Sequence, residues 1–467
     1  YVVQQLLDAV AELDYPSELL TIQVLDDSTD NTADIVATRV KQLQHRGIKI
    51  EHVRREKREG FKAGAMAYGL NLTDAEFIAI FDADFVPPSD FLRKTVPHFM
   101  SQPRLGIIQT RWGHLNADAN WLTRAQSLAI DSHFVVEQTA RNRAHFLMTF
   151  NGTGGIWRRS CIEDAGGWSS ETLTEDLDLS YRAQIRGWQY LYLPQIVVPG
   201  EIPPVMTAYK HQQARWSQGT NQCLVKLFVP LWSSDLPLLR KVMAMQHLVQ
   251  YLPHAIMLPF FLLTPILIGA GVMRDLPLGW LSLISLIPPL MHVITQADIG
   301  RYSKGNQFSP TNSLRRLIYF PVLLVIGTGL LPNNAAAAYR AFKSRLTHRS
   351  GEFVRTPKFG NRNRQTKAYA LSTNWLTWVE GTFALYAAAG VVLALQKQPE
   401  LAPYLMLYAV AFTAMIVWNF YDQWQLNRLV IAEEPAVEAA SIQFEAVESA
   451  LTEAEIEGEP EYDTIYS

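Results

Sequence analysis

The amino-acid sequence predicts an α/β domain with a mostly parallel sheet, followed by an α-helical transmembrane region. Two patterns predict this fold class: short apolar strands alternate with amphipathic helices early in the chain, and long apolar runs dominate later. Residues 1–240 are mixed and charged, whereas residues 241–300 and 371–422 are strongly apolar. A chain of 467 residues is also longer than one compact domain usually is.

Strand and helix patterns alternate at the start of the chain, and this order predicts a parallel sheet with right-handed connections. In open sheets of this kind, ligands bind beyond the carboxyl ends of the strands. Asp26, Asp27, Asp82 and Asp84 stand at such ends, so we expect them near one edge of the sheet. The strand patterns cover residues 20–28, 48–55 and 75–85, and the helical patterns cover residues 31–43 and 61–72.

Four later apolar runs are long enough to cross a bilayer, which needs about 20 residues. Their internal prolines are compatible with spans, because neighbouring helices satisfy the freed backbone groups. We interpret a further run, residues 317–331, as an interfacial or re-entrant helix, because a full span there would place the basic residues after it outside. The four predicted spans cover residues 244–273, 278–297, 375–395 and 402–420.

Basic residues crowd between the second and third predicted spans, so the positive-inside rule places this loop in the cytoplasm. An even number of spans then places both ends of the chain there. After Arg428 the chain has no Lys or Arg, which predicts a disordered acidic tail. The expected order is a cytoplasmic domain over 1–240 with interfacial helices near 205–240, two spans in 241–300, a cytoplasmic segment over 301–370, two spans in 371–422, and a tail over 423–467.

Composition excludes several functional classes. A formal net charge of −3 provides no basic field for binding nucleic acid. Cys161 and Cys223 are too few for a disulfide framework or a zinc site of the usual spacing, and they fit a reducing compartment. The chain begins at Tyr1 inside an amphipathic helical pattern, so we expect a strand and a membrane span to precede it.

Asp82 and Asp84 are separated by one residue at the end of an apolar strand pattern. Two carboxylates this close repel each other unless a cation lies between them. Oxygen ligands suit Mg²⁺ or Mn²⁺, and such ions also bind substrate phosphates. The pair therefore suggests a metal–diphosphate site, and the alternative is a solvated turn, because the sequence PPSD follows.

Two other segments raise a similar choice between a binding role and a structural one. Asp26 and Asp27 could accept hydrogen bonds from a nucleobase or ribose, or the segment LDDSTDNT could simply cap the next helix. Lys62 lies between Gly60 and Gly64, where small residues allow a ligand to approach and the ammonium group could neutralise a phosphate. The alternative is a Gly/Ala-rich helix packed tightly on the sheet.

Polar residues later in the domain could bind sugar or move a proton. Asn151 lies in a Gly-rich loop, residues 149–159, that could line a sugar pocket. Glu175 and Asp176 follow Thr174, an N-cap residue type, so they either favour the positive end of a helix dipole or supply a general base towards a hydroxyl group.

The segment HQQARWSQGT contains a further possible binding set. Gln212 and Arg215 share a helix face, and Trp216 lies beside them. Arginine can pair with diphosphate oxygens, and an indole face can stack on a sugar ring. The alternative is an interfacial anchor, because Trp and Arg are common where helices meet a membrane surface.

The order of these motifs resembles the processive glycosyltransferases of family two. It runs D-D-S, K-A-G, D-A-D, F-N-G-T, T-E-D and Q-x-x-R-W, followed by membrane spans. That family includes cellulose, chitin, hyaluronan and mannan synthases, and the strongest resemblance is to the cellulose-synthase-like A and C subgroups and their bacterial relatives. The resemblance covers residues 1–422, and FVRTPKFG, residues 353–360, is similar to the gating loop of cellulose synthase.

The resemblance implies a GT-A fold and a role for each matching residue. Asp176 would be the general base, with Glu175 beside it in the same motif. Asp84, with Asp82, would hold the metal, Mg²⁺ or Mn²⁺, that bridges the diphosphate. The substrate and nucleotide would be bound by Asp26, Asp27, Lys62, Asp82, Asn151, Gln212, Arg215, Trp216, Thr356 and Lys358.

The implied reaction is an inverting, metal-dependent transfer of a hexose from a nucleotide sugar to the end of a growing β-glycan, coupled to its translocation. UDP-glucose, GDP-mannose and GDP-glucose all suit the motifs. One alternative is non-processive transfer to a lipid such as ceramide or diacylglycerol. Another is a transporter or membrane scaffold. The predicted spans disfavour it, because they contain fewer ionisable groups than a proton- or ion-coupled carrier usually has.

The resemblance also implies contact with membrane lipid and a place in the bacterial inner membrane, or in the Golgi of a eukaryote.

Overall fold

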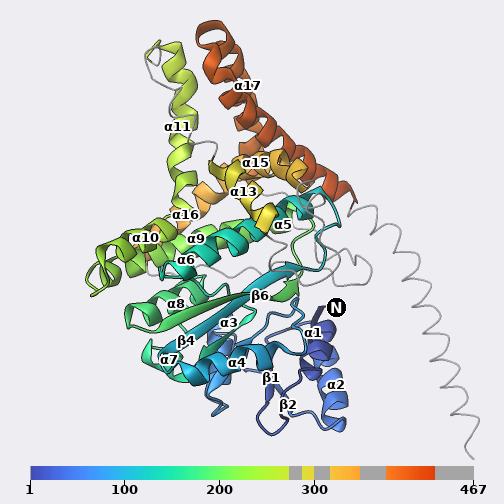
Figure 1. Ribbon diagram of the computed structural model, residues 1–467. Helices are drawn as coiled ribbons and strands as arrows, with labels where there is room; N and C mark the ends of the chain where they lie inside the picture. The colour runs from blue at the N-terminus through green and yellow to red at the C-terminus, as the bar shows by residue number, and fades with distance from the viewer. Residues whose placement is uncertain (1, 273–286, 299–315, 348–374, 426–467) are drawn as a thin grey trace, which may run out of the picture.

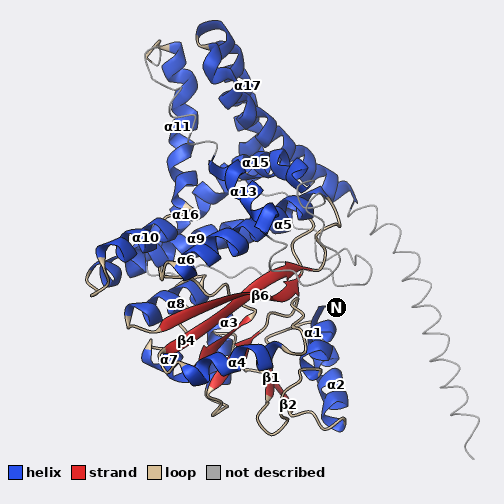
Figure 2. Ribbon diagram, in the orientation of Figure 1, coloured by secondary structure: helices blue, strands red, loops and turns tan. Residues whose placement is uncertain are grey.

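The computed structural model describes residues 2–272, 287–298, 316–347 and 375–425. A sheet-containing domain forms one end of the molecule, and long helices extend from the other end (Figure 1). Between them lies a layer of helices that runs across the molecule (Figure 2). The predicted gating-loop segment and nearly all of the predicted tail lie outside the described residues.

The N-terminal part of the domain follows the expected alternation of helices and strands. Strands β1 and β2 pair in parallel, with Ile22 opposite Ile50. Helices α1 and α2 cover them with apolar side chains at helical spacing, such as Val36, Val40 and Leu43, which are almost fully buried. The elements are α1 Val2–Ala11, β1 Ile22–Leu25, α2 Thr32–His45, β2 Ile50–Val53 and α3 Phe61–Leu70.

The larger sheet has the order β3-β5-β4-β6, and its pairing is mixed rather than mostly parallel. Strand β4 runs parallel to β6, but β5 runs antiparallel to both β3 and β4. Gly155, the first residue of β5, pairs with Ile80, the last residue of β3. The loop that enters β5 therefore lies next to the segment that leaves β3. The strands are β3 Phe77–Ile80, β4 Leu105–His114, β5 Gly155–Arg158 and β6 Gln189–Gly200.

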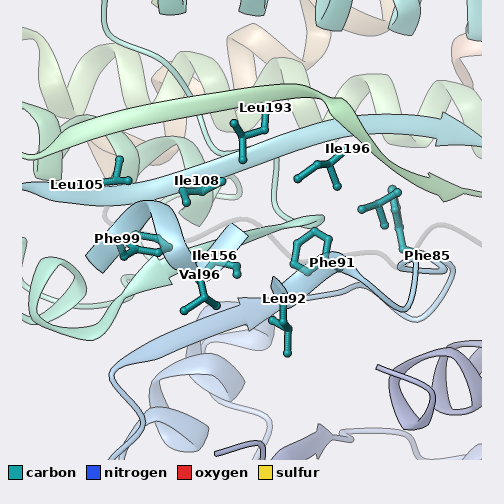
Figure 3. Close-up of a cluster of buried hydrophobic side chains, with 11 residues drawn as sticks. Phe85, Phe91, Leu92, Val96, Phe99, Leu105, Ile108, Ile156, Leu193 and Ile196 are labelled. Atoms are coloured by element: carbon teal, nitrogen blue, oxygen red, sulfur yellow. The ribbon is translucent and has the colours of Figure 1, made fainter. Parts of the chain in front are cut away.

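The sheet packs helices on both faces, because successive strand residues point to opposite sides. On one face, Ile108 and Ile156 join the buried side chains of α4, Phe91–Ser101 (Figure 3). On the other face, Ile107 and Trp157 pack against α7, Arg159–Asp164, and α8, Glu175–Ile185. The two cores hold the ends of the strands, and the loops after them, in fixed positions.

Three helices among the described residues are long and apolar enough to cross a membrane, and they coincide with three of the four predicted spans. Of the remaining predicted span, residues 278–297, the structure describes only the part that lies in α13, Ile287–Asp298, and this helix of 12 residues is shorter than a span. The run at 317–331 belongs to a pair of helices, Arg316–Gly329 and Leu331–Ser344, bent by 44°. The three candidate membrane helices are α11 Leu252–Gly269, α17 Trp375–Lys397 and Pro399–Gln425.

The layer between the sheet and the candidate membrane helices consists largely of polar and amphipathic helices. One helix there contains a π-helical stretch, His133–Gln138, between α5, Trp121–Ser132, and α6, Thr139–Arg143. Crossing the same layer are α9 Met206–Trp232, α10 Leu238–Leu248 and α16 Leu331–Thr347, with α15 Phe320–Gly329 beside them (Figure 1).

We predict that Ile156→Ala destabilises the chain by about 2–5 kcal/mol, because Ile156 is fully buried between the sheet and α4 and its truncation leaves a cavity. Thermal or denaturant unfolding of the purified chain measures the change. Leu19→Ala is the control, since Leu19 is 71% exposed. Equal effects of the two substitutions would contradict the assigned core.

Candidate active site

The two aspartates after β3 lie in a turn, not in an extended strand. The Phe85 N–H donates to the Asp82 carbonyl at 2.9 Å, and the Glu201 N–H donates to the Asp84 carbonyl at 3.2 Å. Phe85 also forms a bridge with Gly200 at the end of β6. The end of β6 therefore fixes the turn, and the strand ends at Ile80, before both carboxylates, rather than at residue 85 as the strand pattern predicted.

Lys62 joins this turn to the Gly-rich loop. Its Nζ lies 2.5 Å from Asp82 Oδ1 and donates to the Gly152 carbonyl at 2.8 Å. The Asp82 N–H donates to Thr153 Oγ1 at 2.8 Å. Three segments that are far apart in the sequence thus meet at one ammonium group.

Asp176, at the start of α8, lies against the same loop. Gly152 has a φ of +83°, and a Cβ built on it would lie 3.0 Å from Asp176 Oδ2. A side chain at Gly152 would therefore crowd the carboxylate, in a backbone conformation that already favours glycine. The Phe150 N–H donates to Ser180 Oγ at 2.9 Å, and this hydroxyl donates to the Asp176 carbonyl, which ties α8 to the loop.

Thr174 occupies the N-cap position of α8, but its side chain makes no capping hydrogen bond. Its hydroxyl lies 3.4 Å from the sulfur of Cys223 on α9. A Cβ at Gly219, one turn earlier on α9, would lie 2.8 Å from Thr174 Oγ1. The start of α8 is therefore held by packing against α9 as well as by the helix dipole.

The charges in the site shift one another's protonation equilibria. Burial, followed by the Glu175 charge, raises the pKa of Asp176 to about 7, while Lys62 and Arg215 oppose that shift. Burial also raises the pKa of Glu175, with Lys62 opposing and Asp82 adding to the shift. Burial alone would lower the pKa of Lys62, but the nearby carboxylates outweigh it and hold the pKa above its usual value. Lys62 therefore stays charged, whereas Asp176 can exchange a proton near neutral pH.

Helix α9 brings Arg215 close to these acids. Its positive charge therefore opposes the rise in the pKa of both Glu175 and Asp176. Gln212 and Trp216 are partly buried on the same helix. The Leu173 N–H donates to Gln222 on α9 at 2.9 Å, which holds the helix against the segment before α8. The Q-x-x-R-W and T-E-D motifs are thus adjacent in space.

Asp26 and Asp27, which follow β1, are bound by neighbouring side chains. Asp26 Oδ2 lies 2.8 Å from His52 Nε2, and Asp26 Oδ1 accepts the Ser28 N–H at 2.8 Å. Asp27 forms an ion pair with Arg55, and Arg55 also donates to the Phe61 carbonyl at 3.1 Å. Phe61 directly precedes Lys62, so Arg55 connects this pair to the rest of the site.

Several contributors were not identified from the sequence. The sequence contains a signal for Arg55, because Arg54 and Arg55 form a basic pair directly after β2. Gln109, from β4, accepts the Asn151 N–H at 2.9 Å, and His133 Nε2 lies 3.3 Å from Asn151 Oδ1. His133 begins the π-helical stretch, and π-helical turns often occur at functional sites, but periodicity in the sequence does not reveal them. Thr356 and Lys358 lie outside the described residues.

The donor set suits a hard cation that is shared with a substrate. The described residues contain no group of three or more His, Cys, Asp or Glu side chains that could hold a metal alone. Asp82 and Asp84 supply carboxylates from a single turn, and Mg²⁺ or Mn²⁺ commonly binds one or two carboxylates together with water and phosphate oxygens. These residues therefore fit an ion that arrives with a diphosphate.

The model of a family described as glycosyl transferase family group 2 matches residues 77–295. The match includes the turn after β3, the Gly-rich loop, the start of α8 and the motif residues of α9. This match supports the family 2 glycosyltransferases that the motif order indicated. The predicted combination of an α/β domain with long apolar helices after it is confirmed.

Among curated relatives, the chain is 38% identical over 281 residues to "Glucomannan 4-beta-mannosyltransferase 9" of Arabidopsis thaliana, covering 56% of this chain and 52% of the relative. It is 43% identical over 225 residues to "Probable glucomannan 4-beta-mannosyltransferase 4" of Oryza sativa subsp. japonica, covering 47% and 41%. The chain spans about half the length of the curated relatives it matches. These similarities confirm the resemblance to cellulose-synthase-like glucomannan synthases.

Among solved structures, the chain is similar to a mannosyltransferase from Pyrobaculum calidifontis, in complex with GDP-Man and Mn²⁺. Its TM-score to this chain is 0.47 at 18% sequence identity, over 73% of this chain and 83% of the other.

We predict that Asp176→Asn makes the chain progressively more stable than the native form as pH rises from 5 to 8. A folded-state pKa of about 7 lies above the ordinary value of 3.8, so the native form loses stability as pH rises through that interval. The variant has no such proton to lose. Thermal unfolding without nucleotide, at several pH values, measures the difference.

Asp118→Asn is the control for this experiment, because the Asp118 side chain is 93% exposed. A difference in melting temperature between Asp176→Asn and the native chain that stays constant with pH would contradict the raised pKa.

Proposed function

We propose that this chain is an inverting membrane glycosyltransferase that transfers mannose from GDP-mannose to the 4-hydroxyl at the end of a growing β-glycan of the glucomannan type. The observation that carries the proposal is the meeting of Lys62, Asp82 and Asp176 around the Gly152 backbone. A base, a phosphate-compensating cation and a metal-ligand turn in one site are the parts that such a transfer needs.

The printed names of the relatives support mannose as the sugar, since they are 4-beta-mannosyltransferases of glucomannan. Of the three donors that suit the motifs, GDP-mannose is the one that delivers mannose. Asp26 and Asp27, at the end of β1, would contact the base and ribose. His52 and Arg55 would orient these two carboxylates.

Asp176 suits the role of general base. A carboxyl with a pKa of about 7 can accept a proton near neutral pH and still hold it firmly. In the proposed step the acceptor hydroxyl attacks the anomeric carbon on the face opposite the diphosphate, so the α-linked donor gives a β-linked product. The hydroxyl proton passes to Asp176 as the carbon–oxygen bond forms.

Lys62 and Arg215 would compensate the charge that develops on the departing diphosphate. Both cations already lie near the acids of the site, so little rearrangement is needed at the moment of reaction. Asp82 and Asp84 would hold Mg²⁺ or Mn²⁺, which when bound supplies further positive charge at the diphosphate. Asn151, Gln212 and Trp216 would orient the acceptor, with Thr356 and Lys358 closing over the donor.

The candidate membrane helices support a place in a membrane, either the bacterial inner membrane or the Golgi of a eukaryote. The basic residues between the predicted spans support a cytoplasmic catalytic domain. With the donor and the site on that side, the growing glycan would leave through the helices, in contact with membrane lipid.

We predict that Asp176→Asn lowers the transfer rate by at least about 10²–10⁴-fold, the usual contribution of a general base. Donor affinity should stay near normal, because the amide keeps the shape of the side chain. Radiolabelled sugar transfer and direct nucleotide-sugar binding measure the two effects. Glu163→Gln is the control, since Glu163 lies on the surface of α7.

Substantial turnover by Asp176→Asn, with the control unchanged, would show that another group accepts the proton.

We also predict that the purified full chain transfers mannose from GDP-mannose in the presence of Mn²⁺ or Mg²⁺ and loses this activity in EDTA. Linkage analysis should find a ladder of β-1,4-linked oligosaccharides. A screen of GDP-mannose, GDP-glucose and UDP-glucose against membranes and soluble oligosaccharide acceptors tests this. A single glycolipid would support transfer to lipid instead, and nucleotide binding without turnover would support a non-enzymatic role.

A further inference from the structure

Helix α9 connects the site to the candidate membrane helices through charged and polar contacts. Lys210 of α9 forms an ion pair with Glu380 of α17, 170 residues away in the chain. Lys210 is 8% exposed and Glu380 is fully buried. A carboxylate inside an apolar helix is costly to bury unless it is paired, so ionisable groups at such positions usually have a function.

Three further contacts fix α9 on the same side. Asp422, on the helix Pro399–Gln425, accepts the N–H of Met206, the first residue of α9, at 2.6 Å. Asn333 of α16 donates to the Lys210 carbonyl at 3.0 Å, and Ser217 of α9 donates to the Asn334 carbonyl at 3.1 Å. Directional contacts of this kind define the rotation and the axial position of a helix more closely than apolar packing does.

The opposite face of α9 contacts the transferase site. Successive helical residues turn by about 100°, so Gln212, Arg215 and Gly219 lie roughly opposite Lys210 and Ser217. Gly219 packs against Thr174, directly before the two acids of α8. Lys226, further along α9, lies 3.1 Å from Asp178 of α8. One continuous helix therefore contacts the site on one face and the candidate membrane helices on the other.

We propose that Glu380 is a positioning residue for the transferase site: its ion pair with Lys210 sets the position of α9, and so the distance of Arg215 and Gln212 from Asp176. The inference rests on the proposed function and adds to it a role for a residue far from the reacting atoms. Through this ion pair, the position of α17 affects the geometry of the site, which no motif of the sequence indicates.

The test compares native chain, Glu380→Gln, Lys210→Glu and the swapped pair Lys210→Glu with Glu380→Lys, each as full-length protein in lipid. We expect Glu380→Gln to lower kcat/KM by about 10–100-fold, the usual effect of misplacing a binding group by about 1 Å. The swapped pair should recover most of that loss, to within about threefold of the native value. Asn419→Ala is the control, because Asn419 contacts Thr377 of α17 at 3.2 Å.

The pH profile separates positioning from a simple loss of folded protein. Asp176 is acted on by Glu175, Lys62 and Arg215, and the Arg215 charge lowers the pKa of Asp176. If α9 moves Arg215 away, the acid limb of kcat/KM shifts to higher pH in Glu380→Gln. A variant that merely folds less completely keeps the native midpoint.

A second readout needs no turnover. Thr174 Oγ1 lies 3.4 Å from Cys223 Sγ, so Thr174→Cys places two sulfurs near bonding distance across the α8–α9 contact. We expect rapid disulfide formation under mild oxidation in this variant and slower formation when Glu380→Gln is added. The cross-link is detected by mass spectrometry.

Unchanged cross-linking and an unchanged pH midpoint in Glu380→Gln would overturn the inference, as would a swapped pair that recovers nothing while remaining folded. If the native protein transfers no sugar, but cross-linking in Thr174→Cys still depends on Glu380, the proposed function is refuted and the link between α17 and α9 stands.

Discussion

The contact on which the site depends is the one between Lys62 and the two groups it bridges, the Asp82 carboxylate and the Gly152 carbonyl. A half-buried ammonium group is stable only when anions and carbonyls replace its water. The same holds in reverse for the acids, because Asp82, Glu175 and Asp176 could not share this volume without a cation. The ammonium group and the carboxylates therefore depend on each other, because each charge offsets the free-energy cost of burying the others.

The antiparallel direction of β5 makes this meeting possible. Since Gly155 pairs with Ile80, the loop that enters β5 comes to the edge where β3 ends. A parallel β5 would have carried the Gly-rich loop to the other end of the sheet, away from Asp82. At that edge, the left-handed backbone of Gly152 and its missing side chain leave room for Asp176.

The parts of the site that the sequence predicted are those with local signals. Asp82 follows an apolar strand, and Asp176 lies in the first turn of a helix, and both positions are visible from apolar patterning alone. The pairing of Asp27 with Arg55, and the turn of His133 towards Asn151, depend on contacts between segments 28 and 18 residues apart. The direction of β5 cannot be predicted from its own residues either, because a strand of four residues carries no signal of whether it pairs parallel or antiparallel. Sequence patterning therefore identified candidate residues, and the tertiary pairing decides which of them lie together.

The position of α9 has a consequence for the chemistry. Arg215 opposes the burial and the repulsion that raise the pKa of Asp176, so the proton affinity of Asp176 depends on where α9 lies. The other face of α9 meets α16 and α17 through buried polar groups rather than apolar packing alone. Such groups tolerate little displacement, because a shifted partner leaves a buried charge unpaired. Under the proposed function, this coupling would tune Asp176 for transfer only while the candidate membrane helices are correctly assembled around the site.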